Sequence, residues 1–378
     1  MASKLKFGLI GLGNAGNQIL TKLLESPNAT LMAAAEPQAD NRETFTRETG
    51  LPAVSSIDEL LKLDIDAVWV ATPNEMHAPH VISAAQSGRH VICEKPMALT
   101  VEDCDRMIAA AEANGVKLML GHSKLIEPPI VKMREIIDSG ALGSVIQVSL
   151  MNYNDWLQRP RFSNELDTSQ GGGICYRQAP HQVDIVRYLV GRPVRTVRSL
   201  AGRADPNFAT EGHYSTFLEF DGSVAATLTY NAYGYFHVAE LTWDIGEGGN
   251  RVVPLAERMP KARLTGPVTA GTKYSAAKER HGGQKVAPPF YGLTVVSCER
   301  GVLRQSPKGV FVYDESGVHE IEVPLSYSIE RDLGELVSSI EHKRPPFPDG
   351  HWGRATTQVC LAMLESSRLH AEIELSGR

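Results

Sequence analysis

The sequence lacks three features that would each have assigned it to a class of proteins. It has no basic excess, since 38 lysines and arginines are outnumbered by 44 acidic residues and the net charge is −6. This balance argues against a nucleic-acid partner. The five cysteines include no pair with CxxC spacing, so we expect free thiols rather than disulfides or a metal site. No apolar run reaches the roughly 18 residues of a membrane span, and no signal peptide is visible. These absences predict a cytoplasmic protein that binds no membrane.

The chain of 378 residues is too long for one ordinary hydrophobic core, so we expect two domains. Strand and helix patterns alternate over residues 4–122, which predicts βαβ units and a parallel, doubly wound sheet. After Pro128-Pro129 and one helix, strands follow one another with little helix between them. They are predicted at 145–152, 194–201, 213–220, 224–230, 238–245 and 309–313. The expected architecture is an α/β domain at 1–124 and an α+β domain with a mostly antiparallel, open sheet at 125–378.

Two further segments bear on this division. Helices are expected at 329–343 and 354–371, and the C-terminal helix is expected to pack back on the first domain. Residues 246–289 are rich in Gly, Pro, Lys and Arg, and 261–285 is basic. Such a length without periodicity predicts a flap, a subunit-contact arm or a disordered segment.

A glycine-rich turn follows the first predicted strand. Gly11, Gly13 and Gly16 form GxGxxG between a strand and a helix. The first glycine permits the turn, the second admits a pyrophosphate and the third permits close helix packing. The phosphate would rest on amides at the start of the helix, at Asn14 and Ala15. The turn therefore predicts a dinucleotide site.

Glu36, at the end of the second predicted strand, indicates which dinucleotide is bound. An acid about 20 residues beyond the glycine turn hydrogen-bonds the ribose hydroxyls and repels a 2′-phosphate. NAD is therefore the predicted cofactor. Arg42 could in principle meet a 2′-phosphate, which leaves NADP open.

Two more strands of the expected parallel sheet end in polar residues. Thr72-Pro73-Asn74-Glu75-Met76-His77 follows the strand at 67–71, and Glu94-Lys95-Pro96 follows the strand at 90–93. Ligands of open α/β sheets bind at the carboxyl ends of the strands, so we expect Thr72, Pro73, Asn74, His77, Glu94 and Lys95 to border the cofactor. A lysine at this position predicts the proton-transfer group of a dehydrogenase.

These motifs, together with a triple glycine at 171–173 followed by His181-x-x-Asp184, resemble the glucose–fructose oxidoreductase, inositol dehydrogenase and rhizopine-catabolism (Gfo/Idh/MocA) family. The resemblance implies an NAD-binding Rossmann domain and a second domain for substrate binding and oligomerisation. It also implies that Lys95 is the catalytic lysine, often followed by a cis proline, and that His181 belongs to the site. Family members commonly oligomerise through the outer face of the second sheet, which implies a homo-oligomer, either a dimer or a tetramer.

The substrate side departs from the family's sugar-binding members. Arg177, His181 and Asp184 are spaced i, i+4 and i+7, which predicts one shared helix face. Sugar and inositol members typically carry an aspartate where this chain has Arg177. Arginine holds carboxylates in a two-bond fork. The exchange argues for a carboxylated substrate and against a neutral sugar.

The loop at 152–161 combines aromatic and basic residues: Tyr153, Trp156, Arg159 and Arg161. The rings could pack against a flat substrate and the arginines could pair with its carboxylates. The alternative is a solvated loop whose arginines pair with Asp155 or Glu165.

The loop, the Arg177 segment and the run at 289–301 resemble a subgroup of phthalate cis-4,5-dihydrodiol dehydrogenases. That resemblance implies oxidation of 4,5-dihydro-4,5-dihydroxyphthalate to 4,5-dihydroxyphthalate, with Lys95 as proton acceptor and His181 as rival base or orienting group. Two alternatives stay open: a sugar, inositol or sugar-acid dehydrogenase of the same family, and a non-catalytic NAD-binding regulator.

Overall fold

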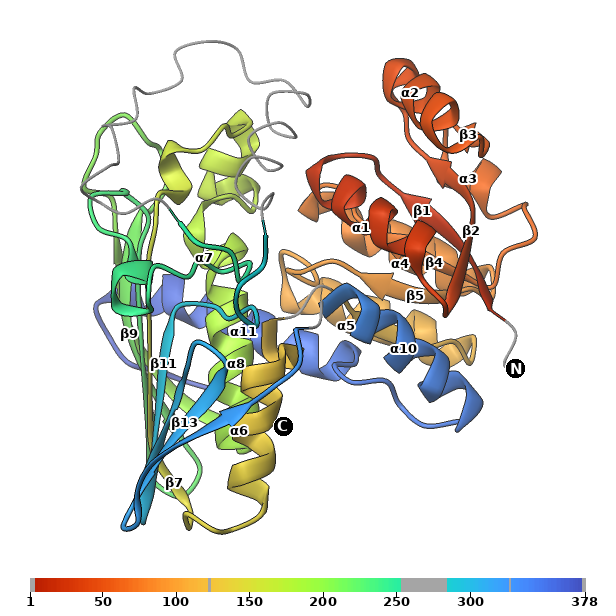
Figure 1. The fold of residues 1–378 in the computed structure, drawn as a ribbon. Helices are drawn as coiled ribbons and strands as arrows, with labels where there is room; N and C mark the ends of the chain where they lie inside the picture. The colour runs from red at the N-terminus through yellow and green to blue at the C-terminus, as the bar shows by residue number, and fades with distance from the viewer. Residues whose placement is uncertain (1–3, 122–123, 253–283, 326–327, 376–378) are drawn as a thin grey trace. The chain divides into compact units, whose positions relative to one another are not determined.

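The computed structural model describes residues 4–121, 124–252, 284–325 and 328–375 (Figure 1). They form two compact units: the first contains the described residues of 1–123 and 328–357, and the second those of 124–327 and 358–378. Most of the segment expected to be a flap, arm or disordered tract, 253–283, lies outside the described residues.

The first unit is built on a six-stranded parallel sheet, which confirms the predicted doubly wound α/β domain. The strand order is β3-β2-β1-β4-β5-β6. The strands are β1 (Leu5–Ile10), β2 (Ala29–Ala35), β3 (Ala53–Val54), β4 (Ala67–Val70), β5 (His90–Cys93) and β6 (Leu118–Leu120). The connecting helices are α1 (Asn14–Glu25), α2 (Ala39–Thr49), α3 (Ile57–Leu60), α4 (His77–Gln86) and α5 (Val101–Ala113), with a 3-10 turn, η1 (Asn74–Met76), before α4.

Both faces of this sheet are covered. In β4, Val68 and Val70 belong to the core beneath α4 and α5, whereas Ala67 and Trp69 belong to the core beneath α1. All four side chains are buried because successive side chains of a strand point to opposite faces. The polar residues that follow such strands are therefore left at the carboxyl edge.

The chain returns to the first unit near its end. In α10 (Ser328–Glu341), Leu333 and Leu336 are fully buried in the same core cluster as Ile19 and Leu23 of α1. The first turns of α11 (Gly350–Leu369) also belong to this unit, and Arg354 pairs with Asp105 of α5.

The second unit is built on a nine-stranded sheet of order β14-β13-β12-β11-β7-β10-β9-β8-β15. Every pairing is antiparallel except that of β7 with β10, which confirms the predicted mostly antiparallel sheet. The strands are β7 (Val145–Tyr153), β8 (Val194–Gly202), β9 (His213–Phe220), β10 (Val224–Asn231), β11 (Leu293–Cys298), β12 (Gly301–Gln305), β13 (Gly309–Asp314), β14 (Gly317–Glu322) and β15 (Ile373–Glu374). Two helices pack on one face: α6 (Pro128–Asp138) and α8 (Ala179–Val190).

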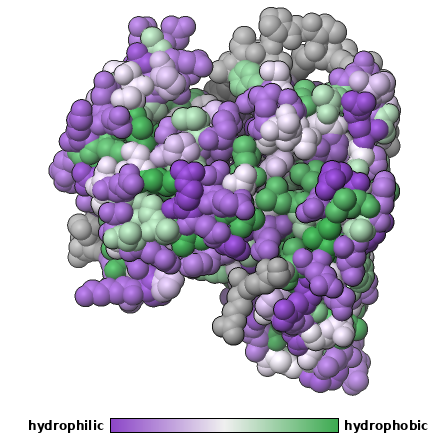
Figure 2. All heavy atoms as spheres, turned by 180° about the vertical axis from the view of Figure 1, so that it is seen from behind, coloured by the Kyte–Doolittle hydropathy of each residue, from purple (hydrophilic) through white to green (hydrophobic). Residues whose placement is uncertain are grey.

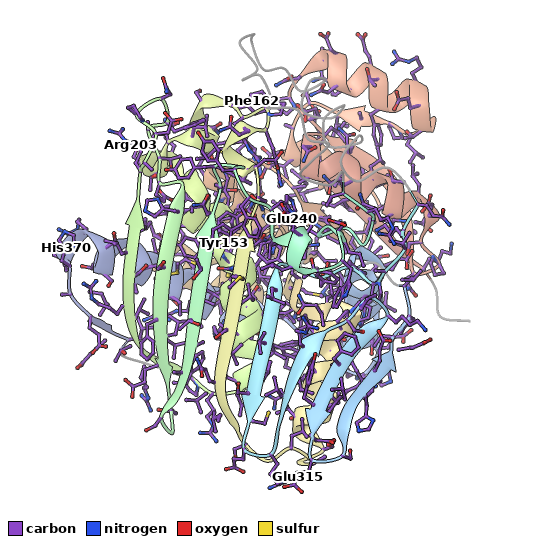
Figure 3. The ribbon with its side chains drawn as sticks, turned by 60° about the vertical axis from the view of Figure 1, so that its left-hand side comes forward. Tyr153, Phe162, Arg203, Glu240, Glu315 and His370 are labelled. Atoms are coloured by element: carbon purple, nitrogen blue, oxygen red, sulfur yellow. The ribbon has the colours of Figure 1, made fainter. Side chains whose placement is uncertain are left out.

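The parallel pairing of β7 and β10 places their carboxyl ends at one edge, with Asn152 opposite Tyr230 and Tyr153 opposite Asn231. Figure 3 shows Tyr153 and Phe162 toward one end of the sheet and Glu315, in the β13–β14 turn, at the other. The loop after β7 is therefore on the same side as the polar ends of both strands.

One predicted strand, 238–245, is wrong. Its first half is a 3-10 helix, η6 (Val238–Leu241), and Trp243 and Asp244 have positive φ angles of 57°. The Thr242 hydroxyl lies within hydrogen-bonding distance of the carbonyls of Val238, Ala239 and Ile245. Local bonds thus take the place of a sheet ladder.

The predicted helix face shared by Arg177, His181 and Asp184 is also wrong. Arg177 ends a short helix, α7 (Gly173–Arg177), whereas His181 and Asp184 lie on α8. Pro180 has no amide hydrogen to continue the first helix, and Gln178 takes φ −121° and ψ −39° between the two. The three residues therefore come from two helices.

Hydrophilic side chains dominate the face in Figure 2, with apolar groups scattered among them. Within the described residues, no helix is long and apolar enough to cross a membrane.

Candidate functional site in two halves

The glycine turn of the first unit has the geometry that its motif predicts. Gly11 has a φ of +94°. A Cβ on Gly16 would lie 2.0 Å from the Gly11 carbonyl oxygen, so only glycine fits where α1 meets the turn. A Cβ on Gly13 would meet nothing within 4 Å, so its backbone faces open space. An open, side-chain-free cradle at a helix start is where a pyrophosphate binds.

Two other groups at this turn suit a dinucleotide. The Glu36 carboxylate, which is buried, accepts hydrogen bonds from the amides of Leu12 (2.9 Å) and Gln38 (3.1 Å), which holds it against the turn. The Asn14 side-chain oxygen is buried and has no hydrogen-bond partner in the structure. These groups, with the amides of Asn14 and Ala15, fit the phosphates and ribose of NAD.

Arg42, the residue that could have met the 2′-phosphate of NADP, is instead directed at the backbone that follows β2. Its Nη1 donates to the carbonyls of Glu36 (2.9 Å) and Pro37 (2.7 Å). The guanidinium thus braces the end of β2 and supports the conformation that presents Glu36.

Glu94 and Lys95 follow β5 at the same edge, and the Lys95–Pro96 peptide is cis, as the family resemblance implied. Lys95 is half-buried and Glu94 is buried. The Trp69 indole donates to Glu94 across 3.3 Å. Burial raises the pKa of Glu94 to about 7, although Lys95 and the Trp69 bond act in the opposite direction. The acid next to the lysine in sequence therefore keeps its proton to a higher pH than an exposed glutamate would.

His77 connects the two loops that follow β4 and β5. Its Nδ1 lies 2.8 Å from the Pro96 carbonyl oxygen and its Nε2 lies 3.0 Å from the Thr72 carbonyl oxygen. The ring is buried, with 1% of the residue exposed. His77 therefore contacts both loops, and its ring nitrogens are directed at backbone atoms of those loops.

In the second unit, Arg161 and Arg177 share one carboxylate. The Nη1 atoms of Arg177 and Arg161 lie 3.3 and 3.4 Å from Oε1 of Glu165. The Arg161 guanidinium also lies 4.1 Å from the ring centroid of Trp156, which is buried. The loop after β7 is thus packed rather than solvated, but its arginines form the ion pairs of the alternative interpretation, Arg159 with Asp155 and Arg161 with Glu165. Arg177 of α7 lies at the same carboxylate oxygen as Arg161.

The other predicted substrate residues have structural contacts as well. Arg159 donates to Asp155 at 3.0 Å, and the Tyr153 ring packs on Phe236 with centroids 5.5 Å apart. Asp184 lies 3.9 Å from Arg187, one turn along α8.

His181 faces a cluster of buried tyrosines. Its ring centroid is 5.0 Å from that of Tyr291, and the Tyr291 and Tyr230 hydroxyls donate to the side-chain oxygen of Gln178 at 2.7 and 3.2 Å. Burial raises the pKa of both tyrosines, so they remain hydrogen-bond donors at any physiological pH. The His181 ring therefore packs on Tyr291, one member of a buried, hydrogen-bonded group formed with Gln178 and Tyr230.

Glu247 is a site-edge residue that the sequence did not reveal. Its buried carboxylate accepts from the amides of Asn152 and Asn154, each at 3.0 Å. Burial opposes its ionisation, but Arg159 and the Asn152 bond outweigh burial and lower its pKa. Glu247 lies in the segment without periodicity, about 95 residues from its partners, so no local pattern marked it.

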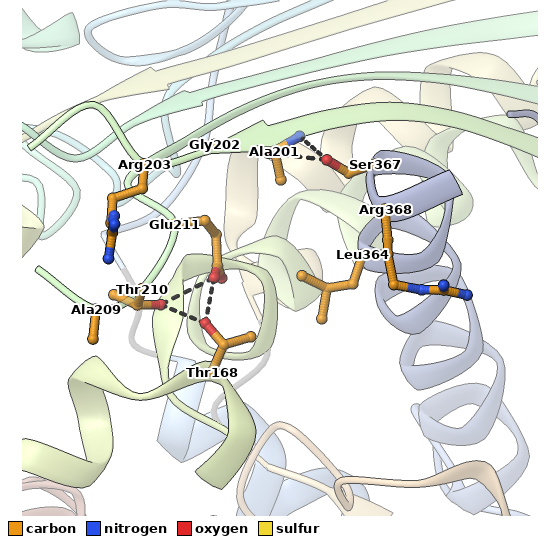
Figure 4. A pocket seen from close by; sticks show the side chains of 10 residues that line it. All are labelled: Thr168, Ala201, Gly202, Arg203, Ala209, Thr210, Glu211, Leu364, Ser367 and Arg368. Carbon is orange, nitrogen blue, oxygen red and sulfur yellow. Dashed lines mark hydrogen bonds between the residues drawn. The ribbon is translucent and has the colours of Figure 1, made fainter. Parts of the chain in front are cut away.

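A cavity of about 340 Å³ lies elsewhere in this unit, between the end of β8 and α11 (Figure 4). Its hydroxyl groups are hydrogen-bonded. Thr168 and Thr210 contact each other and the Glu211 carboxylate, and Ser367 accepts from the Ala201 backbone amide. None of the residues predicted for the site lines this cavity. Among the described residues, no cluster of His, Cys, Asp and Glu could hold a metal.

Comparison with known proteins agrees with both halves. The model of the oxidoreductase family with an NAD-binding Rossmann fold (Gfo/Idh/MocA) matches residues 5–122, and that of the Gfo/Idh/MocA C-terminal domain matches 130–246. The chain belongs to the Gfo/Idh/MocA family. It is accordingly an oxidoreductase with NAD as cofactor.

Several known proteins match nearly the whole chain. The 1-carboxy-3-chloro-3,4-dihydroxycyclohexa-1,5-diene dehydrogenase of Comamonas testosteroni is 34% identical, over 96% of this chain and 95% of its own. A crystal structure of a Bordetella bronchiseptica RB50 protein assigned as a dehydrogenase superposes with a TM-score of 0.89 at 34% identity, over 99% of this chain and all of its own. The WlbA dehydrogenase of Bordetella pertussis, in complex with NADH and UDP-GlcNAcA, shares the fold at 20% identity (TM-score 0.74, 100% of this chain and 99% of its own).

Proposed function

We propose that the protein oxidises a carboxylated cyclic cis-diol with NAD⁺, to a product that becomes a catechol. The single observation that carries this is that the guanidinium groups of Arg161 and Arg177 lie together at Glu165. Arg177 stands four residues before His181, where the family's sugar enzymes typically have an aspartate. The full-length relative from Comamonas testosteroni acts on a carboxylated dihydroxycyclohexadiene. 4,5-Dihydro-4,5-dihydroxyphthalate is one candidate of this class.

The roles of the residues follow from their chemistry. Arg177 and Arg161 would bind the ring carboxylate, and His181 would orient a hydroxyl. Lys95 would accept the hydroxyl proton as the C–H bond of the same carbon breaks. NAD⁺, when bound at the glycine turn, supplies the hydride acceptor. Loss of one proton and one hydride converts the alcohol to a ketone, and the resulting enone tautomerises to a catechol. Aromatisation makes the oxidation effectively irreversible.

Lys95 must be neutral to accept a proton. Partial burial and nearby positive charge favour the neutral amine, whereas an ionised Glu94 would oppose it. Because the pKa of Glu94 is raised to about 7, that opposition is reduced at neutral pH. The pair Glu94–Lys95 is thus suited to proton transfer near neutrality.

The division of labour is part of the proposal: residues 1–124 bind NAD, and 125–378 bind substrate and form a homo-oligomer. The sheet face opposite α6 and α8 would be the subunit contact. It carries exposed apolar side chains on three strands: Ile146 (51% exposed), Leu200 (54%) and Phe217 (43%). Burying them against a second copy would remove apolar surface from water.

The test is a substrate panel with NAD⁺, followed by the absorbance of reduced nicotinamide. It should contain carboxylated cis-dihydrodiols, the same ring diols without a carboxylate, inositols, sugars and sugar acids. We expect turnover with the carboxylated diols. Turnover with sugars or inositols instead would assign the sugar-enzyme alternative, and NAD binding without any turnover would assign a regulator.

A further inference from the structure

We propose that Glu165 is a specificity-determining residue that limits the arginine pair to a substrate with one carboxylate. This rests on the proposed function and names its substrate more narrowly: a cyclohexadiene cis-diol monocarboxylate rather than a dicarboxylate such as the phthalate diol.

The carboxylate of Glu165 is held at three points. Oε1 lies 3.3 Å from Arg177 Nη1 and 3.4 Å from Arg161 Nη1, and Oε2 accepts the Phe162 amide at 2.8 Å. The Glu165 side chain is 5% exposed, and those of Arg161 and Arg177 are 15% and 20% exposed. The acid therefore occupies an anion position between the two guanidinium groups within the protein itself.

Local structure fixes this position. Glu165 lies on the 3-10 turn η4 (Ser163–Leu166), whose backbone lies close to Gly172, the residue before α7. A Cβ on Gly172 would lie 2.4 Å from the Asn164 carbonyl oxygen and 2.7 Å from the Glu165 carbonyl carbon. The middle residue of the triple glycine thus permits the approach that brings Glu165 to Arg177. Arg161 is held from its other side by the Trp156 ring.

Charge at such a site decides what it accepts. Two guanidinium groups carry two positive charges and Glu165 neutralises one of them, which leaves one positive charge to pair with one substrate carboxylate. A third carboxylate, which a dicarboxylated substrate would bring, would be placed close to Glu165 with little water to screen the repulsion. The site should therefore favour one substrate carboxylate over two.

The experiment compares two ligand pairs in the wild-type enzyme and in Glu165→Gln. The first pair is a cis-dihydrodiol of benzoate and the 4,5-cis-dihydrodiol of phthalate, compared by kcat/KM. The second pair is benzoate and phthalate, compared by calorimetric affinity for the NADH-bound protein. Glu299→Gln is a control with the same change in net charge. Glu299 is an exposed acid that accepts a hydrogen bond from the Ser144 amide.

We expect the wild type to prefer the monocarboxylate by about tenfold or more, which corresponds to roughly 1.4 kcal/mol. Glu165→Gln should reduce or reverse that preference, chiefly through the KM of the dicarboxylate, and Glu299→Gln should not. The inference would be overturned if the wild type used or bound the monocarboxylate and the dicarboxylate equally well, or if it bound neither acid. It would also be overturned if a folded Glu165→Gln protein kept the wild-type ratio of kcat/KM values for the two diols. The wild-type ratio decides the matter if that variant does not fold. Selective binding without oxidation of either diol would instead refute the proposed reaction and leave the selectivity of Glu165 standing.

Discussion

The imidazole of His77 lies 2.8 Å from the carbonyl oxygen of Pro96, the residue after Lys95, and its other nitrogen lies 3.0 Å from the Thr72 carbonyl oxygen. A carbonyl oxygen only accepts, and a neutral imidazole has one N–H, so the ring can donate to both only when it is protonated. The ring fastens the loop that carries the lysine to the loop that follows β4.

His77→Phe should therefore reduce kcat by about 10–100-fold, because small misplacements of a reacting group are costly. KM for NAD⁺ should change little, and His77→Gln, which retains donors, should recover part of the rate. His351→Gln, at an exposed histidine, serves as the control. A raised KM for NAD⁺ with unchanged kcat would return His77 to the cofactor-contact role that its motif predicts.

Lys95→Ala should lower kcat by at least about 100-fold, since a positioned acid or base contributes roughly 10²–10⁴-fold. Binding of NAD⁺, measured by fluorescence quenching, should be nearly unchanged. A variant that keeps turnover within tenfold of wild type would exclude Lys95 as the main proton acceptor.

The glycine turn offers a matched pair of substitutions. Gly13→Ala adds a methyl group into open space at an ordinary φ of −71°, so stability should hold while NAD⁺ affinity falls about tenfold or more. Gly16→Ala adds the same group 2.0 Å from the Gly11 carbonyl oxygen, so the free energy of unfolding should fall by about 1–3 kcal/mol. Thermal denaturation and NAD⁺ titration separate the two effects. Equal loss of stability in both variants would contradict the open cradle at Gly13.

Glu36→Ala should weaken NAD⁺ binding and reduce the enzyme's preference for NAD⁺ over NADP⁺. The acid both accepts the Leu12 and Gln38 amides and, when the cofactor is present, would accept the ribose hydroxyls. We expect kcat/KM for NAD⁺ to fall about 10–100-fold and that for NADP⁺ to fall less. An unchanged ratio of the two cofactors would mean that another residue discriminates between them.

Glu94 should make stability depend on pH. Its pKa is raised by burial from 4.5 to about 7, so the folded state retains a proton that the unfolded chain has lost. Stability should therefore fall as pH rises from about 4.5 to about 7 and then level off, by up to about 3 kcal/mol. The free energy of unfolding of Glu94→Gln should depend less on pH over this range, as measured by urea unfolding at pH 5 and pH 8. Parallel pH profiles for wild type and variant would show that Glu94 is not the group responsible.

Much of the first unit could be predicted because its signals are local. Most strands are short apolar runs, most helices have a periodic apolar face, and the glycine turn lies within one strand–turn–helix. Fewer elements of the second unit could be predicted. Strands β11, β12, β14 and β15 were not predicted. Of these, β14 is almost wholly exposed and has no apolar pattern.

The candidate site shows the same boundary between local and distant information. The residue types Lys95, Arg177 and His181 could be read from motifs. Glu165 was foreseen as an ion-pair partner of the loop arginines, but its contact with Arg177, 12 residues away, was not. Glu247, which interacts with Arg159, lies in a segment without periodicity and was missed. The break between Arg177 and His181 comes from Pro180, whose missing amide hydrogen outweighs the helical spacing around it.

The burial of Leu333 and Leu336 against α1 has a consequence for biosynthesis. A nascent chain emerging from the ribosome exposes Ile19 and Leu23 for as long as some 300 further residues remain to be made. The first unit, although its strands are translated first, buries this apolar surface only after α10 has been synthesised. Chaperones that recognise apolar helix faces would have their longest opportunity there.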